Sequence, residues 1–117
     1  MDLSLVGKRA VVCGSSQGIG WAAAQELAEL GAEVTLLARD AGRLTSALAA
    51  LSTSRAQVHT RTVADFSDPA QIERAAAEIL DRSGTVQILV NNTGGPPAGL
   101  AVDATPEQYL AAFTSHL

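Results

Sequence analysis

Short apolar runs alternate along this chain with segments that carry helix signals. The runs at residues 10–13, 34–37 and 86–90 suit strands that are covered on both faces, as in a parallel sheet. Residues 58–63 alternate apolar and polar side chains and predict a more exposed strand. Because a helix is predicted after each strand, the pattern indicates an α/β fold with parallel strands joined by crossover helices.

The first two helices are marked by their composition and their ends. Residues 21–30 are rich in strong helix formers, and Gly31 suits the cap at the end of that helix. Apolar side chains fall on one face of it, at Ile19, Ala23, Leu27 and Leu30. Asp40 suits the N-cap of a second helix that ends near Leu51.

A third helix begins with a clear signal. Asp68 suits the N-cap, Pro69 the first helical position, and Gln71 the partner position of a capping box. Its buried face is predicted to consist of small and branched aliphatic side chains, at Ile72, Ala75, Ala76 and Ile79. Gly84 ends it, and the same start signal at residues 105–108 predicts a fourth helix.

Composition narrows the function classes. The chain has 117 residues, a formal net charge of −4 and 47% hydrophobic residues, which disfavours a nucleic-acid binder and wholesale disorder. Cys13 is the one cysteine, so no intrachain disulfide and no cysteine-based metal site are predicted. No apolar run is long enough for a membrane helix, and the first residues do not follow the order of a secretory signal. We expect a cytoplasmic protein without a bound metal.

A glycine-rich turn at residues 14–20 separates the first strand from the first helix. Backbone N–H groups at a helix start are unsatisfied, and glycine lets a pyrophosphate come close to them. A tight turn without a ligand is the alternative interpretation of the glycines alone. The strand before the turn and the helix after it favour a nucleotide site.

Two motifs resemble one family. Residues 13–20, Cys-Gly-Ser-Ser-Gln-Gly-Ile-Gly, resemble the Thr-Gly-x-x-x-Gly-Ile-Gly turn of short-chain dehydrogenases/reductases. Residues 91–94, Asn-Asn-Thr-Gly, resemble that family's Asn-Asn-Ala-Gly motif after its fourth strand. The whole chain matches the N-terminal half of the family's domain and looks most like the 3-oxoacyl-(acyl-carrier-protein) reductase group. The resemblance implies a doubly wound parallel-sheet Rossmann fold with strand order 3-2-1-4.

The resemblance also implies cofactor contacts residue by residue. The first turn would hold the phosphates and ribose side of a nicotinamide dinucleotide through Gly14, Ser16, Gln17, Gly18, Ile19 and Gly20. The adenine would contact Asp65, with Phe66 beside it. The ribose on the nicotinamide side would contact Asn92, Thr93 and Gly94, whereas Asn91 would brace the sheet.

The end of the second strand bears on which dinucleotide binds. An NAD-specific site commonly places an acid there, but this chain has Ala38 followed by Arg39. A guanidinium can hold a 2′-phosphate with two hydrogen bonds, so NADP(H) is favoured over NAD(H). The alternative is a solvated Arg39 that pairs with Asp40 at the surface. The basic residue that many NADP-binding relatives carry inside the glycine turn is absent.

The catalytic groups that the family uses are absent from this chain. The family's proton donor is a Tyr with a Lys four residues later and a Ser that orients the substrate. Here Tyr109 is followed at that spacing by Phe113, and the one lysine is Lys8. His116 stands where the family usually has the Asn of a proton relay, so it either relays protons or leaves the relay broken.

These observations predict half of a larger enzyme. We expect residues 1–117 to be a dinucleotide-binding half-domain, inactive alone, from a single-domain reductase of about 250 residues. The parent would transfer hydride between NADP(H) and a small carbonyl or alcohol substrate, as a homodimer or homotetramer. The alternative is a non-catalytic dinucleotide-binding module. A methyltransferase of Rossmann type is disfavoured by residues 91–94 and by the missing acid at position 38.

Overall fold

The structure is a computed structural model that describes residues 4–14 and 18–91. Within these residues a parallel four-stranded sheet has the order β3-β2-β1-β4, which confirms the predicted strand order. The strands are β1 (Arg9–Cys13), β2 (Glu33–Ala38), β3 (Thr60–Val63) and β4 (Ile88–Asn91). The helices between them are α1 (Gly18–Glu29), α2 (Ala41–Ala50) and α3 (Pro69–Ser83). The predicted fourth helix lies outside the described residues.

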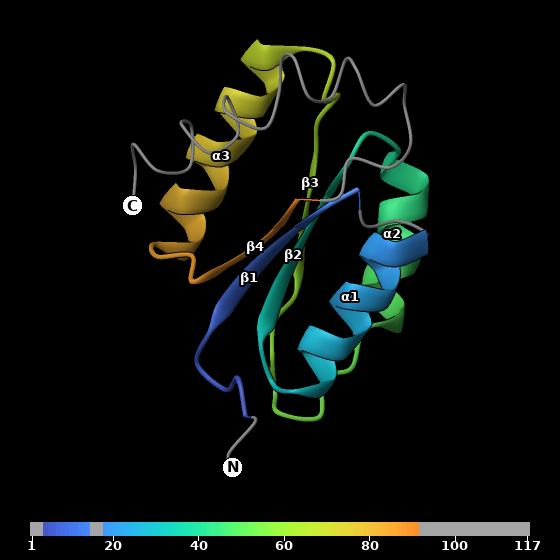
Figure 1. The fold of residues 1–117 in the computed structure, drawn as a ribbon, viewed down its shortest axis with the longest axis vertical. Coiled ribbons are helices and arrows are strands. Elements are labelled where there is room, and N and C mark those ends of the chain that lie inside the picture. The colour runs from blue at the N-terminus through green and yellow to red at the C-terminus, as the bar shows by residue number, and fades with distance from the viewer. Residues whose placement is uncertain (1–3, 15–17, 92–117) are drawn as a thin grey trace.

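Helices cover both faces of the sheet, with α1 and α2 on one face and α3 on the other (Figure 1). Side chains along β1 alternate between the two faces, and both faces are buried. Ala10 and Val12 pack toward α1 and α2, whereas Val11 and Cys13 pack toward α3. None of these four side chains is more than 1% exposed, which explains why the strand is apolar at every one of these positions.

The buried face of α1 differs from the predicted one. The residues in contact with the core are Gly20, Ala24 and Ala28, one position beyond Ile19, Ala23 and Leu27. Small side chains at these positions let the helix lie close to the sheet, and the larger Leu27 packs at the margin of the cluster. Ile19 is 79% exposed. The apolar spacing therefore identified the helix but placed its buried face one residue too early.

The third strand is shorter than predicted. Before its first residue, the side chain of His59 accepts a hydrogen bond from a backbone N–H of β2. β3 begins at Thr60, and Val58 is 71% exposed. The N–H of Val34 in β2 donates to His59 Nδ1 at 3.0 Å, and His59 Nε2 lies 2.7 Å from the carbonyl oxygen of Ser52. Since Nδ1 accepts, the ring hydrogen is on Nε2 and is donated to Ser52. The imidazole thus replaces one backbone bond of the sheet.

The helix α3 confirms its predicted ends, with one difference. Asp68 accepts a hydrogen bond from the N–H of Ala70, Pro69 is the first helical residue, and Gly84 is the C-cap. The side chain of Gln71 does not accept from the N–H of Asp68, as a capping box requires. Its Oε1 accepts instead from the N–H of Asp65, at 2.9 Å. The first turn of α3 is therefore tied to the end of β3.

The other predicted elements are confirmed with small shifts. α2 has Asp40 as its N-cap, and Asp40 accepts from the N–H of Arg43. The fourth strand, predicted at residues 86–90, occupies Ile88–Asn91. Among the helices of the described residues, none has the length and apolar character that crossing a membrane requires.

The turn between α1 and β2 depends on Gly31. Its N–H donates to the carbonyl of Ala28, and the N–H of Ala32 donates to the carbonyl of Leu27, which is the Schellman pattern of helix ends. Gly31 has φ +104°, which side chains disfavour, and a Cβ there would lie 2.7 Å from Val6 Cγ2. Both the backbone conformation of Gly31 and its contact with Val6 therefore disfavour any side chain at this position.

We therefore expect Gly31→Ala to lower the free energy of unfolding of the full protein by about 1–3 kcal/mol, as measured by urea denaturation. Gly42→Ala in α2 is the matched control. A Cβ at Gly42 meets only Asp40 Oδ1, at 3.4 Å, and alanine is the better helix former, so stability should be unchanged or slightly raised. Equal losses in the two variants would contradict this account of the turn.

Candidate functional site

The described candidate residues lie where the strands end. The carboxyl ends of the parallel strands form one edge of the sheet, toward the upper part of Figure 1. Gly14 follows β1, Arg39 follows β2, and Asp65 lies two residues after β3. The N–H of Gly14 donates to the carbonyl of Leu37 at 2.8 Å, which places Gly14 beside the end of β2. A ligand at this edge can contact loops that are far apart in the sequence.

Two glycines of the predicted glycine turn have a backbone that favours glycine. Gly14 and Gly18 both have φ +67°, a left-handed conformation that side chains rarely adopt. Gly20 is buried where α1 begins, whereas Ile19 is exposed. The turn therefore ends at the start of a 12-residue helix with small residues on its sheet side. This arrangement fits an approaching diphosphate, whose charge the first N–H groups and the helix dipole would favour.

The thiol of Cys13, the last residue of β1, packs on the α3 face of the sheet and is unreactive. It is 1% exposed, and burial raises its pKa to about 12. The protonated thiol is a poor nucleophile, so Cys13 serves as a small buried side chain of the core.

Arg39 is exposed at the end of β2, directly after the buried Ala38. The alternative partner, Asp40, caps α2 and forms an ion pair with Arg43 at 3.7 Å. Within the described part of the chain, no ion pair joins Arg39 to Asp40. The charge of Arg39 acts instead on Asp65 across the neighbouring strand end. Among the residues that the structure describes, no carboxylate forms an ion pair with the guanidinium of Arg39, so it suits a phosphate at this edge.

Asp65 is half-buried and tightly held. Its Oδ1 accepts from the backbone N–H of Ser67 at 2.9 Å and from Ser67 Oγ at 2.8 Å. These two hydrogen bonds lower the pKa of Asp65 below its ordinary value of 3.8, and Arg39 lowers it further. The carboxylate is therefore ionised at neutral pH and acts only as a hydrogen-bond acceptor. Phe66 packs against the cluster between the sheet and α3.

Ser67 and Gln71 were not among the predicted site residues. Both hold Asp65, Ser67 through its carboxylate and Gln71 through its backbone N–H. The Asp-x-Ser spacing was a usable signal, because Asp side chains often accept hydrogen bonds from the residue two positions later. Gln71 gave no such signal, since its sequence position fits an ordinary capping box.

Some predicted site residues lie outside the described residues. They belong to the glycine turn, to the segment after β4 and to the last predicted helix, and they are Ser16, Gln17, Asn92, Thr93, Gly94 and His116. Asn91 ends β4 opposite Cys13 and is exposed. In residues 4–14 and 18–91, no group of three or more His, Cys, Asp or Glu side chains is placed to hold a metal ion.

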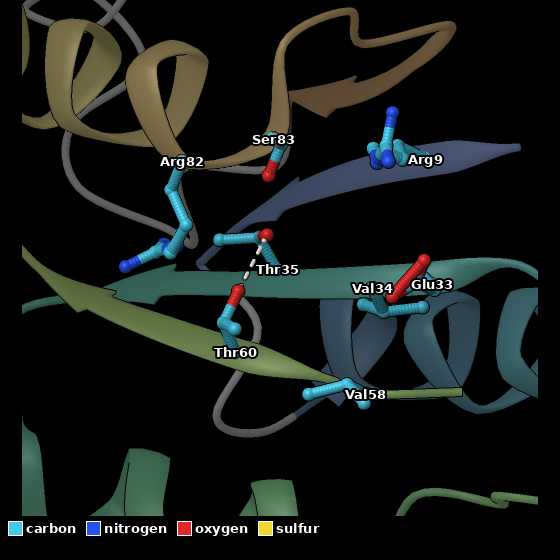
Figure 2. Close-up of a pocket in the computed structure, with 8 residues that line it drawn as sticks. All are labelled: Arg9, Glu33, Val34, Thr35, Val58, Thr60, Arg82 and Ser83. Carbon is cyan, nitrogen blue, oxygen red and sulfur yellow. Dashed lines mark hydrogen bonds between the residues drawn. The ribbon is translucent and has the colours of Figure 1, made fainter. Parts of the chain in front are cut away.

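A shallow hollow of about 270 Å³ lies at the opposite edge, where the strands begin. Figure 2 shows the Thr35 and Thr60 hydroxyls turned toward one another in it, with Oγ1 atoms 2.9 Å apart. Arg82, which also lines the hollow, already has two partners. Its guanidinium donates to Thr62 Oγ1 and forms an ion pair with Glu78. None of the predicted site residues lines this hollow.

Comparison with known proteins decides the family. The sequence model described as short chain dehydrogenase matches residues 8–115. The chain belongs to the short-chain dehydrogenase family. This confirms the resemblance on which the sequence interpretation rests, and it makes the protein a relative of oxidoreductases.

Individual short-chain dehydrogenase relatives match most or all of this chain. A Streptomyces violaceoruber protein, named as ketoacyl reductase 1 of a granaticin polyketide synthase, is 42% identical over 92% of this chain. The Pseudomonas aeruginosa RhlG/NADP complex is 30% identical, with a TM-score of 0.84 over 99% of this chain. L-Sorbose reductase from Gluconobacter frateurii, solved with NADPH and L-sorbose, is 29% identical, with a TM-score of 0.79. This chain covers 39%, 50% and 48% of these relatives, respectively.

The hydrogen bonds from Ser67 to Asp65 predict that the stability of the fold depends on pH. Because folding lowers the pKa of Asp65, the carboxylate contributes stability above pH 3.8, and this contribution is lost as the pH falls through the lowered pKa. Ser67→Ala should raise that pKa part of the way to 3.8, since the backbone N–H bond and Arg39 remain. A carboxyl ¹³C NMR titration measures it. Ser46→Ala, at an exposed serine of α2, should leave it unchanged.

Proposed function

We propose that this chain is the cofactor-binding half of an NADP(H)-dependent short-chain reductase. The observation that best supports this proposal is the common position of three segments at the carboxyl ends of adjacent strands. The predicted glycine turn follows β1, Arg39 follows β2, and Asp65 follows β3. When bound, the nicotinamide ring of the cofactor supplies or accepts a hydride. The residues of this chain bind and orient the dinucleotide.

Each part of the dinucleotide has a proposed contact. The left-handed glycines and the start of α1 suit the diphosphate, as described above. Asp65 suits the adenine, because an ionised carboxylate accepts from an amine. The segment at residues 92–94 stays a prediction for the ribose beside the nicotinamide, and so does Phe66 for the adenine.

The preference for NADP(H) over NAD(H) rests on Ala38 and Arg39. An acid at the end of β2 would repel a 2′-phosphate, but alanine leaves that place neutral and the next residue is cationic. Solved relatives in complex with NADPH or NADP are consistent with this choice. A small carbonyl or alcohol is the proposed substrate class, and a ketoacyl group is favoured by the named activity of the Streptomyces relative.

We propose that the whole protein, and not residues 1–117 alone, catalyses the hydride transfer. The spacing Tyr109–Phe113 offers no lysine beside the tyrosine, so residues 1–117 are proposed to be inactive alone. His116 is retained as a candidate member of the proton relay. The same absence favours a second candidate, a dinucleotide-binding module without catalysis. A cytoplasmic location and a dimer or tetramer belong to the proposal through the family resemblance.

Titrating the full protein with NADPH tests the proposal. We expect saturable binding by nicotinamide fluorescence and oxidation of NADPH when ketoacyl or sugar carbonyl substrates are added. Binding without turnover of any substrate, in a protein that lacks a Tyr-x-x-x-Lys pair, would favour the non-catalytic module. Absence of dinucleotide binding would exclude both candidates.

Arg39→Ala tests the cofactor preference. We expect the Kd for NADPH to rise about tenfold while the Kd for NADH changes little, because only NADPH carries the 2′-phosphate. Arg55→Ala is the control, since Arg55 is an exposed arginine in the loop before β3, at the other edge of the sheet. Equal weakening of NADPH and NADH in Arg39→Ala, or tighter NADH binding by the wild type, would reject NADP(H) specificity.

A further inference from the structure

The loop between β3 and α3 holds Asp65 at its backbone and at its side chain. The backbone N–H of Asp65 donates to Gln71 Oε1 at 2.9 Å. The carboxylate accepts through Oδ1 from both hydrogen-bond donors of Ser67. A side chain held at both places loses most of its rotational freedom, because neither the backbone nor the carboxylate can turn without breaking a hydrogen bond.

The two oxygens of this carboxylate differ. Oδ1 is occupied by the Ser67 N–H at 2.9 Å and by Ser67 Oγ at 2.8 Å. Oδ2 has no hydrogen bond to any other residue in the described ranges 4–14 and 18–91. Because Oδ1 is held by two donors, the direction of Oδ2 follows from it. Oδ2 is therefore an acceptor atom whose direction is fixed and which no other described residue occupies.

Gln71 connects this arrangement to a rigid element. It lies in the first turn of α3, and its Nε2 donates to Oδ2 of the N-cap Asp68 at 3.3 Å. The amide thus bridges the helix cap and the Asp65 backbone. A site supported by a helix is held more precisely in position than one supported by a loop alone.

We propose that Ser67 and Gln71 are positioning residues that hold Asp65 Oδ2 to accept a hydrogen bond from the exocyclic amine of adenine. This inference rests on the proposed function, since it assumes that a dinucleotide binds at this edge. A carboxylate that only accepts selects a base with an amine and rejects a base with a carbonyl at the same place. Arg39 lies near the carboxylate, so base recognition and the proposed phosphate contact would be neighbours.

Base discrimination in the full protein tests the proposal. Kd values are measured for NADPH and NADH, each against the analogue in which hypoxanthine replaces adenine, and for reduced nicotinamide mononucleotide, which has no such base. The wild type should prefer adenine about tenfold, as a lost hydrogen bond to a charged group predicts. Ser67→Ala and Gln71→Ala should reduce that preference to about threefold or less, with no change for the mononucleotide.

Conservative and distant variants provide the controls. Ser67→Thr keeps both donors and should retain the wild-type preference for adenine. Ser46→Ala and Gln25→Ala change exposed residues of α2 and α1 and should also retain it. A merely structural role would weaken all three ligands together and would leave the ratio between the two bases unchanged.

The remaining outcomes separate the two proposals. If the wild type binds dinucleotides without preferring adenine, or if Ser67→Ala keeps the full preference, the positioning role is wrong and the proposed function stands. If the wild type binds no dinucleotide, the proposed function fails and this inference fails with it. Loss of folding in Gln71→Ala is detected by circular dichroism, and Ser67→Ala, at an exposed position, then decides the test.

Discussion

The pairing of β1 with both β2 and β4 is the constraint on which the rest of this structure depends. Cys13, the last residue of β1, lies opposite Leu37 on one side and Asn91 on the other. Because all pairs are parallel, every strand reaches the same edge before its loop begins. Burial of β1 on both faces stabilises this register, since shifting it by one residue would exchange the side chains of the two faces. The candidate site is a consequence of that arrangement.

The loops at this edge are held by the helices that follow them. Asp40 and Asp68 cap α2 and α3, so the residues just before these helices are anchored by side-chain hydrogen bonds. Gln71 extends the second anchor back to Asp65. The opposite edge is organised differently, because His59 joins β2 to the loop after α2 and holds that end of the sheet. Side-chain contacts thus hold the loops at both ends of the strands, whereas the candidate site residues lie at the carboxyl ends alone.

Membership of the short-chain dehydrogenase family makes the edge at the carboxyl ends of the strands the candidate cofactor site. The family match covers residues 8–115, whereas the chain spans about half or less of the relatives compared above. What this chain contributes to the family's chemistry is therefore proposed to be binding and orientation of the dinucleotide. The family resemblance also implies a tyrosine with a lysine four residues later, and at Tyr109 that position holds Phe113.

The sequence alone was sufficient to predict the strand order and the caps at Asp40 and Asp68. These features depend on local periodicity, on residues with restricted conformations and on two family motifs. It was not sufficient for the buried face of α1, because close packing against the sheet favours the small Gly20, Ala24 and Ala28 over the apolar stripe beside them. Nor did it indicate that Gln71 would reach Asp65. Only the tertiary structure decided these contacts, because they depend on how near one element comes to another, and spacing within one element carries no such distance.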